Sequence, residues 1–447
     1  MPLTQGEQRV CDEIAARGDD LVGLVSALVG FDTTAREVGE PAREEAALQE
    51  HLADRLRAAG AEVDVWEPDA EALQGRPLVP PGLDFAGRPQ LIARRPGGGS
   101  GRSLVFNGHI DVVSAEPRDS WTSDPFVAQV RDGKLYGRGS CDMKGGVAAM
   151  VLAFETLSSQ GVELGGDLLV ATNTDEESSG AGGVALVEHG LTADAGIVTE
   201  PTGFEAWVAC RGSEYCEVRV PGRPGHAEIA QPDWREGGAV NAIEKAILVL
   251  EAIRALRREW AGRDDLDHPL LSRPSLLPTM ARSGEWPVTY PSQCELTVAV
   301  MFVPGQADEQ GWGSEVRREF EEWLARETSV DDWLSEHPPV VQWWPNHVMP
   351  MEIDPSEPIV ETVLAATADV GRDGRLSGLD SWYDGAALTL LGGIPSIGFG
   401  PPGFDRNGVS VAHMVDEFVP VDGLVSCAQA LAVAAMRFCG VAQCPSA

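Results

Sequence analysis

The sequence predicts an α/β fold in which a mostly parallel central sheet is flanked by helices, with a smaller α+β domain inserted into the chain. Short apolar runs that read as buried strands alternate with helical stretches, as in parallel sheets covered on both faces. That alternation stops near residue 206 and resumes after residue 335. The chain also has 447 residues, which is more than one hydrophobic core usually holds. Two domains are therefore expected.

The predicted central strands are the apolar runs at 104–106, 168–171, 195–198 and 394–399. Each run leads, directly or through a glycine loop, to acidic or histidine side chains. In parallel sheets, ligands bind at the carboxyl ends of the strands. We therefore expect one site to gather the residues that follow these runs, which are His109, Glu176, Glu177, Glu200 and His413.

Helical periodicity predicts the layers that cover this sheet. Apolar residues recur at helical spacing within 20–60, and the helical stretches 145–158 and 180–190 alternate with predicted strands. A further helix is expected at 356–368. The Pro- and Gly-rich passage at 74–89 is predicted to be an irregular surface loop.

The interrupting segment has a different pattern. Residues 214–220 and 294–302 alternate in polarity, as antiparallel strands do, and 239–260 is a long amphipathic helical stretch. We predict a discontinuous first domain at 1–205 and 336–447, and a second domain inserted at 206–335.

Composition excludes several classes of partner. Hydrophobic residues make up 43% and charged residues 23% of the chain, as in ordinary globular proteins. The formal net charge of −35 argues against binding to nucleic acid or to an anionic membrane. No secretory signal or membrane-spanning segment is expected. The eight cysteines are scattered without a CxxC pair, which favours reduced thiols in a cytoplasm.

A glycine-rich stretch at 137–146 surrounds a single carboxylate, Asp142, and precedes a helical run. Glycine permits close approach of the backbone to a ligand, so this pattern favours an aspartate displayed at a tight turn. We interpret Asp142 as the residue that bridges two metal ions. The alternative is a helix N-terminus with an aspartate near the cap.

Two divalent ions about 3.5–4 Å apart can act together on a carbonyl group and a water molecule. Such a site needs carboxylates and imidazoles, with one carboxylate shared by both ions. The candidate ligands are His109, Asp142, Glu177, Glu200 and His413. Each of these residues alone is compatible with a structural or surface role. The coincidence of four such residues at separate strand ends, with a further carboxylate in a glycine loop, favours metal.

Two more carboxylates complete the candidate site. Glu176, beside Glu177, is left free of metal to take a proton from water. Asp111 lies two residues after His109, so in an extended segment it points the same way and can accept the other imidazole N–H.

These motifs resemble the dinuclear zinc aminoacylase/carboxypeptidase family, which includes acetylornithine deacetylase, succinyl-diaminopimelate desuccinylase, carboxypeptidase G and cytosolic dipeptidases. The matching stretches are 109–113, 137–145, 176–177, 200–202 and 412–413, in the family's order. The resemblance implies a zinc-peptidase-like catalytic domain with an inserted dimerisation, or lid, domain. It also implies two Zn²⁺ ions per subunit, with Co²⁺ or Mn²⁺ as alternatives.

Carried over residue by residue, the resemblance implies that His109 and Glu200 bind one zinc and that Glu177 and His413 bind the other. Asp142 bridges the ions, Glu176 is the general base, and Asp111 supports His109. A histidine after a glycine turn, here His226, reaches the active site of a partner subunit in the family and steadies the oxyanion. A homodimer through the inserted domain is therefore implied.

The chain departs from the family where many relatives carry an arginine for the substrate carboxylate. Met301 or a neighbour stands there, and losing the arginine removes a bidentate clamp. Either the substrate lacks an α-carboxylate, or Arg211 or Arg282 serves instead. Asp384 and Gly385 resemble substrate-side residues of the family.

The favoured function is hydrolysis of the amide bond of an N-acyl amino acid or a related small molecule, as in deacetylases and desuccinylases. The alternatives are a metallo-carboxypeptidase or dipeptidase of the same family, and a non-catalytic binding protein that retains the fold. The last of these predicts a lost ligand or base, and none is missing.

Overall fold

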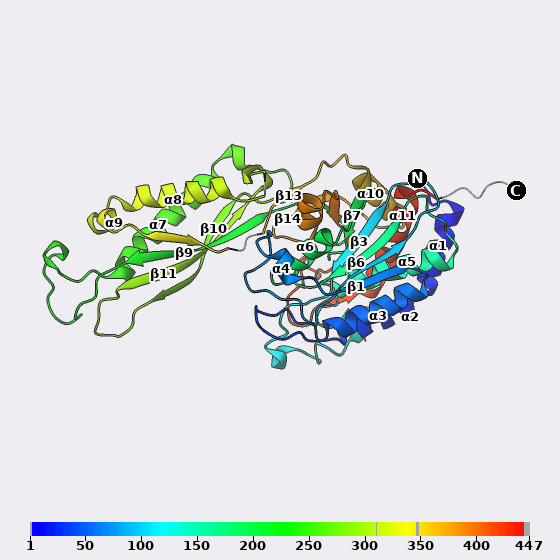
Figure 1. Cartoon of the computed structure of the whole chain (residues 1–447), viewed down its shortest axis with the longest axis horizontal. Coiled ribbons are helices and arrows are strands. Elements are labelled where there is room, and N and C mark those ends of the chain that lie inside the picture. Colours follow the sequence, from blue (N-terminus) through cyan, green and yellow to red (C-terminus); the bar gives the residue numbers. More distant parts are fainter. Residues whose placement is uncertain (1, 310, 346–347, 442–447) are drawn as a thin grey trace. The chain divides into compact units, whose positions relative to one another are not determined.

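A computed structural model of the chain describes residues 2–309, 311–345 and 348–441 (Figure 1). The chain divides into two compact units. Unit 1 comprises Met1–Ala209, Glu352–Gly378 and Tyr383–Ala447, and unit 2 comprises Cys210–Met351 and Leu379–Trp382. Unit 2 is thus inserted into unit 1 in the sequence, and it reaches beyond residue 335 because the strand β12 (Val340–Trp343) belongs to its sheet.

Unit 1 is built on a 9-stranded sheet with the order β1-β2-β6-β3-β7-β15-β8-β13, to which β14 is added beside β8. The central pairs β3–β6, β3–β7 and β7–β15 are parallel, while β1, β2 and β8 pair antiparallel at the sides. The strands are β1 (Glu62–Trp66), β2 (Gln90–Arg95), β3 (Leu104–His109), β6 (Leu168–Asn173), β7 (Ala195–Val198), β8 (Ala206–Cys210), β13 (Met351–Glu352), β14 (Leu376–Leu379) and β15 (Ser396–Gly398). The predicted fold class is confirmed.

Helices pack on this sheet as the periodicity predicts. Helix α5 contacts β3 and β6, α6 contacts β2 and β6, and α3 contacts β1 and β2. The helices of unit 1 are α1 (Gln5–Ala16), α2 (Gly18–Val29), α3 (Glu45–Ala58), α4 (Ala70–Leu73), α5 (Lys144–Ser159), α6 (Ala181–Glu188), α10 (Pro358–Asp369) and α11 (Val421–Phe438). Unit 1 also contains a small 3-stranded sheet, made of β4 (Gln129–Arg131), β5 (Lys134–Tyr136) and β16 (Phe418–Pro420).

Helix α11 corrects one expectation, because by length and composition it is apolar enough to cross a membrane. Within unit 1, however, 72% of this segment is buried, and it packs against α1, α5 and α10. Its apolar character is therefore that of a helix in the core of the unit.

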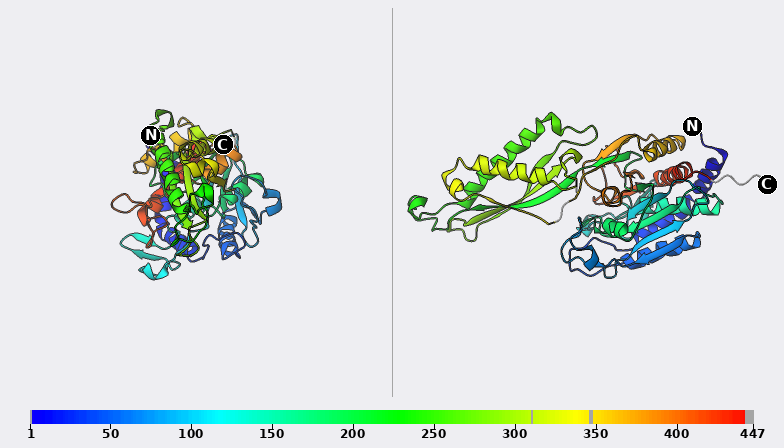
Figure 2. Two further views of the ribbon diagram at one scale, coloured as in Figure 1. Left: turned by 90° about the vertical axis from the view of Figure 1, so that its left-hand side faces the viewer. Right: turned by 45° about the horizontal axis from the view of Figure 1, so that its top comes forward.

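Unit 2 contains a 4-stranded antiparallel sheet with the strand order β10-β11-β9-β12. Helices pack on this sheet (Figure 2). Its longer elements are β9 (Gly212–Pro221), α7 (Ala242–Ala261), β10 (Ser275–Ser283), β11 (Gln293–Phe302), α8 (Ser314–Thr328) and α9 (Asp332–Glu336). Short helical turns lie at Trp234–Glu236, Asp264–Leu266 and Pro304–Gln306 in unit 2, and at Arg118–Ser120 and Ala387–Leu391 in unit 1. Two apolar side chains of α7, Ile243 and Ile247, are about half exposed instead of facing this core.

Candidate metal centre

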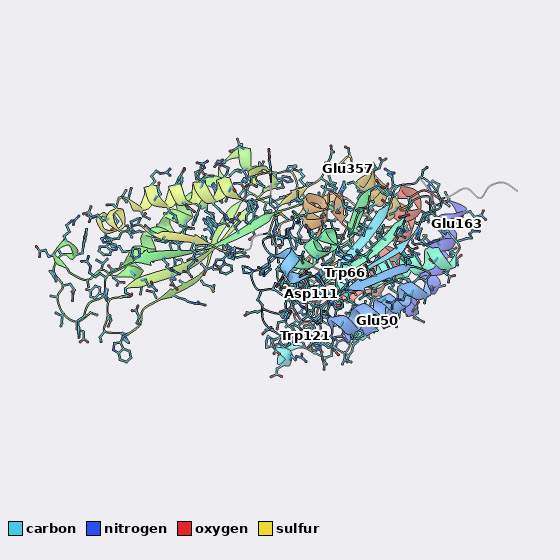
Figure 3. All side chains as sticks on the ribbon, viewed as in Figure 1. Glu50, Trp66, Asp111, Trp121, Glu163 and Glu357 are labelled. Atoms are coloured by element: carbon cyan, nitrogen blue, oxygen red, sulfur yellow. The ribbon has the colours of Figure 1, made fainter. Side chains whose placement is uncertain are left out.

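The candidate centre begins at the carboxyl ends of three neighbouring strands. Strand β3 ends at His109, β6 at Asn173, and β7 at Val198. Because β3 pairs in parallel with both β6 and β7, the segments that leave these strands emerge at one edge of the sheet. Figure 3 labels Asp111 just beyond the end of β3.

The Asp142 carboxylate lies between two histidines that come from distant parts of the chain. Its Oδ1 atom is 3.2 Å from Nε2 of His109, and its Oδ2 atom is 3.3 Å from Nε2 of His413. Glu177 adds a third carboxylate oxygen, 3.1 Å from the same nitrogen of His413. Ligand atoms of His109, Asp142 and Glu177 all lie within 4.8 Å of one another. Each oxygen of one carboxylate thus faces a different imidazole.

Asp111 supports the site in a different way from the one expected. The backbone carbonyl of Asp111 is 2.9 Å from Nδ1 of His109, whereas its carboxylate is 3.6 Å from that atom. The carboxylate instead accepts the backbone N–H groups of Glu176 (3.3 Å) and Glu177 (3.0 Å). Asp111 therefore orients the histidine through its main chain and the two glutamates through its side chain.

Glu176 and Glu200 complete the cluster beside His109. One oxygen of Glu176 is 3.9 Å from Nε2 of His109. Glu200 is buried, and its Oε1 atom has no hydrogen-bond partner among the described residues. An unpartnered carboxylate oxygen in a buried setting is costly unless a cation balances it.

The electrostatics of the cluster also favour binding of a cation. Burial, followed by the charges of nearby carboxylates, raises the pKa of Glu200 and that of Glu176 well above the ordinary value. Hydrogen bonds with Asp142 and Glu177 raise the pKa of His413 to about 10. Burial raises the pKa of Asp111 to about 7. Such a group of like charges is stable in its ionised form only with cations among its members.

The residues therefore fit a metal centre. The donors are imidazole nitrogens and carboxylate oxygens, which suit borderline and hard divalent ions. The Oε1 atom of Glu200 has no hydrogen-bond partner among the described residues, and the two oxygens of Asp142 face different histidines. This arrangement could hold two ions that share the Asp142 carboxylate.

A buried ion pair fixes the turn that carries the two glutamates. Asp175 has a left-handed backbone, with φ of 63°, which is uncommon for a residue other than glycine. Its carboxylate pairs with Arg88, whose side chain is 1% exposed and also donates to the carbonyl of Asp84. Gln90 holds the preceding residue, because it accepts the backbone N–H of Thr174 at 3.0 Å. These contacts could not be predicted from the sequence, where Arg88 is only a charged residue in a loop predicted to lie at the surface.

Two more residues that the sequence did not single out lie behind the centre. Glu417 accepts the backbone N–H of Asp142, and Arg138 pairs with Glu417. Both side chains are buried. Their signal was present in the sequence, because Arg138 stands inside the glycine stretch and Glu417 follows His413 closely.

The weaker substrate candidates are divided between the two units. In unit 1, Asp384 is fully buried, accepts from Asn173 at 2.6 Å and has an unpartnered Oδ1 atom. A side chain at Gly385 would meet the ring of Tyr383 at 2.3 Å, so that position requires glycine.

In unit 2, the guanidinium of Arg211 donates to the carbonyls of Asp380 and Arg273. Arg282 is an exposed residue of β10. His226 is exposed on a loop that pairs with Thr289, and its Nδ1 atom accepts the N–H of Glu228.

The α/β sheet and the cluster of imidazole and carboxylate groups at its edge are those of a metal-dependent hydrolase. Within that class, the chain belongs to peptidase family M20/M25/M40, whose sequence pattern matches residues 105–437. The predicted family and the predicted kind of enzyme, a metal-dependent amide-bond hydrolase, are confirmed.

Curated relatives extend over different lengths of the chain. It is 27% identical over 460 aligned positions to an N-formyl-4-amino-5-aminomethyl-2-methylpyrimidine deformylase of Halalkalibacterium halodurans, covering 96% of this chain and 98% of the relative. It is 41% identical to a succinyl-diaminopimelate desuccinylase of Stenotrophomonas maltophilia, but over 167 residues, or 35% of this chain and 42% of the relative.

Solved structures share the fold at low sequence identity. Human carnosine dipeptidase 1 superposes with a TM-score of 0.70 at 16% identity, covering 99% of this chain and 100% of that one. A dinuclear metal binding peptidase of the M20 family from Bacillus subtilis superposes with a TM-score of 0.64 at 14% identity, covering 95% and 99%.

The Arg88–Asp175 pair gives a prediction about stability. Arg88→Met should lower the free energy of unfolding by about 3–5 kcal/mol, because it leaves the Asp175 carboxylate buried without its partner. Urea unfolding measures this change. As a matched control, Arg94→Met removes a half-exposed arginine that pairs at the surface, and should cost about 0–1 kcal/mol. Equal losses in the two variants would contradict this account of the turn.

Proposed function

We propose that this protein hydrolyses the amide bond of a small N-acyl amine, using two zinc ions held at the centre described above. His109 and Glu200 bind one ion, Glu177 and His413 bind the other, and Asp142 bridges them. The observation that carries the proposal is the placement of the two Asp142 oxygens, each within 3.3 Å of a different histidine. Imidazole and carboxylate donors favour zinc, with Co²⁺ or Mn²⁺ as alternatives.

The protein's own residues then divide the work of proton transfer. When bound, the two ions supply Lewis acidity at the amide carbonyl and lower the pKa of a water molecule. Glu176 is the general base that takes a proton from this water as its oxygen attacks the carbonyl carbon. As the C–N bond breaks, Glu176 returns the proton to the leaving nitrogen. Asp111 keeps Glu176 in place through the backbone N–H of that residue.

The substrate that we propose carries a short acyl group on an amine without an α-carboxylate. By the family resemblance, Met301 or a neighbour in β11 stands where many relatives have a carboxylate-binding arginine, and Arg211 is engaged with backbone carbonyls. A relative matched over nearly its full length is a deformylase that acts on an N-formyl aminomethylpyrimidine. Together these observations favour a deformylase or deacylase of such an amine.

A second candidate is hydrolysis of N-acyl amino acids, as first expected from the sequence. The match to succinyl-diaminopimelate desuccinylases, at higher identity but over a third of the chain, favours it. Asp384 and Gly385 are then substrate-side residues, and Arg282 is the remaining arginine for a carboxylate. Carboxypeptidase and dipeptidase activities rest on the shared fold alone.

We further propose that the inserted domain, 206–335, forms a homodimer and delivers His226 to the partner's active site. Helix α7 and the edge strand β10 are in contact. Both leave apolar side chains about half exposed, Ile243 and Ile247 on α7 and Leu277 and Met280 on β10. Exposed apolar surface of this kind, beside an unpaired strand edge, is typical of an interface.

A cytoplasmic location is part of the same proposal. The seven described cysteines are buried free thiols, whereas Cys444 lies outside the described residues. Reduced thiols are typical of that compartment.

Glu176→Gln tests the assignment of the base. Glutamine keeps the shape of the side chain but cannot accept the proton, so kcat should fall by about 10²–10⁴-fold while zinc content stays at the wild-type level. Steady-state kinetics and elemental analysis measure the two quantities. Glu188→Gln, at an exposed pair with Arg76, is the control and should change neither. Loss of zinc in Glu176→Gln would instead make Glu176 a ligand, and an unchanged kcat would remove its catalytic role.

A substrate panel distinguishes the candidate activities. We expect the highest kcat/KM for N-formyl or N-acetyl aminomethyl heterocycles, because they need no partner for an α-carboxylate. N-succinyl and N-acetyl amino acids and dipeptides should be poorer substrates. Met301→Arg should raise the relative kcat/KM of the carboxylate-bearing compounds, since arginine restores a bidentate partner. A wild-type preference for N-acyl amino acids would support the second candidate instead.

Hybrid dimers test the role of His226 across the interface. Glu176→Gln and His226→Ala proteins should each be nearly inactive alone. Mixed after dissociation, they should recover roughly a quarter of the wild-type rate, because a hybrid dimer has one site with both residues intact. Size-exclusion chromatography verifies that hybrids form. Hybrids without recovered activity would show that His226 does not act in the partner's site.

A further inference from the structure

We propose that Arg138 and Glu417 are positioning residues: this buried pair holds the Asp142 loop and the His413 loop at a fixed separation before any ion binds. The inference rests on the ligand roles of Asp142 and His413 proposed above and extends them to the charges behind the centre.

Glu417 holds the Asp142 loop by its backbone. Its Oε1 atom accepts the N–H groups of Cys141 at 2.9 Å and Asp142 at 3.1 Å. Its Oε2 atom accepts from Nη1 of Arg138 at 2.5 Å. The carbonyl of Glu417 also accepts the N–H of Gly137 at 3.0 Å. The residue that follows His413 by four positions thus fixes both ends of the loop that carries Asp142.

Arg138 connects this contact to the other loops of the centre. Its Nη2 atom donates to the carbonyl of Ser114 at 3.1 Å and to the carbonyl of His413 at 3.4 Å. Ser114 follows the segment that leaves β3 at His109. One guanidinium therefore joins the segments that carry three of the proposed ligands.

The pair contributes little net free energy to the stability of the folded protein. Its side chains are 3% and 1% exposed, and removing two charges from water costs about as much as their attraction returns. The geometry explains its presence, because the side chains of the pair contact the backbone of Cys141, Asp142 and His413, at or next to two proposed ligands. His413 itself has a left-handed backbone, with φ of 64°, which persists only when surrounding contacts hold it.

The consequence concerns the free energy of metal binding. Where loops must be ordered by the ion, part of the binding energy is lost to that ordering. Where Arg138 and Glu417 have already placed Asp142 between the histidines, the ions bind to a preformed centre. Groups that orient metal ligands in this way typically contribute 10–100-fold to affinity.

The first test is hydrogen exchange in the metal-free protein. The backbone amides of Cys141 and Asp142 should be strongly protected in wild type, because Glu417 accepts both. In Arg138→Lys these amides should exchange faster, since a lysine ammonium lacks the planar fork that reaches Glu417 and both carbonyls. Fast exchange of these amides in the metal-free wild type would overturn the proposal.

The second test is metal affinity, measured by zinc competition with a chromophoric chelator and by the visible spectrum of the Co²⁺-loaded protein. Arg138→Lys keeps the buried charge paired and should still fold, yet bind zinc about 10–100-fold more weakly. Its kcat should recover at saturating zinc. The double variant Arg138→Met/Glu417→Gln leaves no lone buried charge and should show the same weakening.

The control is the same exchange at another arginine that pairs with a buried glutamate. Arg317 pairs with Glu214, which is 1% exposed, in unit 2, whereas every proposed ligand belongs to unit 1. Arg317→Lys should leave zinc affinity and the Co²⁺ spectrum unchanged. If the Arg138 variants fold and bind zinc as tightly as wild type, the pair is merely structural and the inference fails. If the wild type itself binds no metal, the proposed function fails instead.

Discussion

The shared carboxylate of Asp142 is the constraint on which the rest of the structure depends. A single side chain can face two imidazoles only if residues far apart in sequence converge at one point. His109 and His413 do so, each near a different oxygen of Asp142. Glu200 and Glu177 add further acidic groups, so carboxylates outnumber basic side chains at this point. Such a cluster is stable in its ionised form when cations occupy it, which is why the site indicates metal more strongly than any one residue does.

The fold provides this convergence by simple means. Central strands β3, β6 and β7 are buried at every residue and run in parallel, so their ends share one edge of the sheet. The loops that follow are fixed by buried charges. Arg88 holds the turn before Glu176, and Glu417 holds the loop of Asp142. Buried ion pairs add little net stability, and here both fix loops that carry residues of the candidate metal centre.

Much of this was predictable from the sequence. Apolar runs predicted the central strands, and the polar residues after them predicted a cluster of acidic and histidine side chains at one edge of the sheet, because both follow from local patterns. The strands β8 and β13 were not predicted, since short buried segments carry no clear period. The contacts of the Asp111 carbonyl with His109 and of the Asp111 carboxylate with the following glutamates were not predicted either. Nor were the contacts of Arg88. Those contacts depend on which backbone atoms the fold brings near a side chain, and a linear pattern does not contain that information.

The stoichiometry of zinc in the metal-reconstituted protein, measured by native mass spectrometry, tests the central claim most directly. The account predicts two ions per chain in wild type and loss of the pair in Asp142→Ala, because no other carboxylate faces both His109 and His413 among the described residues. A wild-type chain that takes up no zinc, or an Asp142→Ala chain that still holds two ions as tightly, would contradict it.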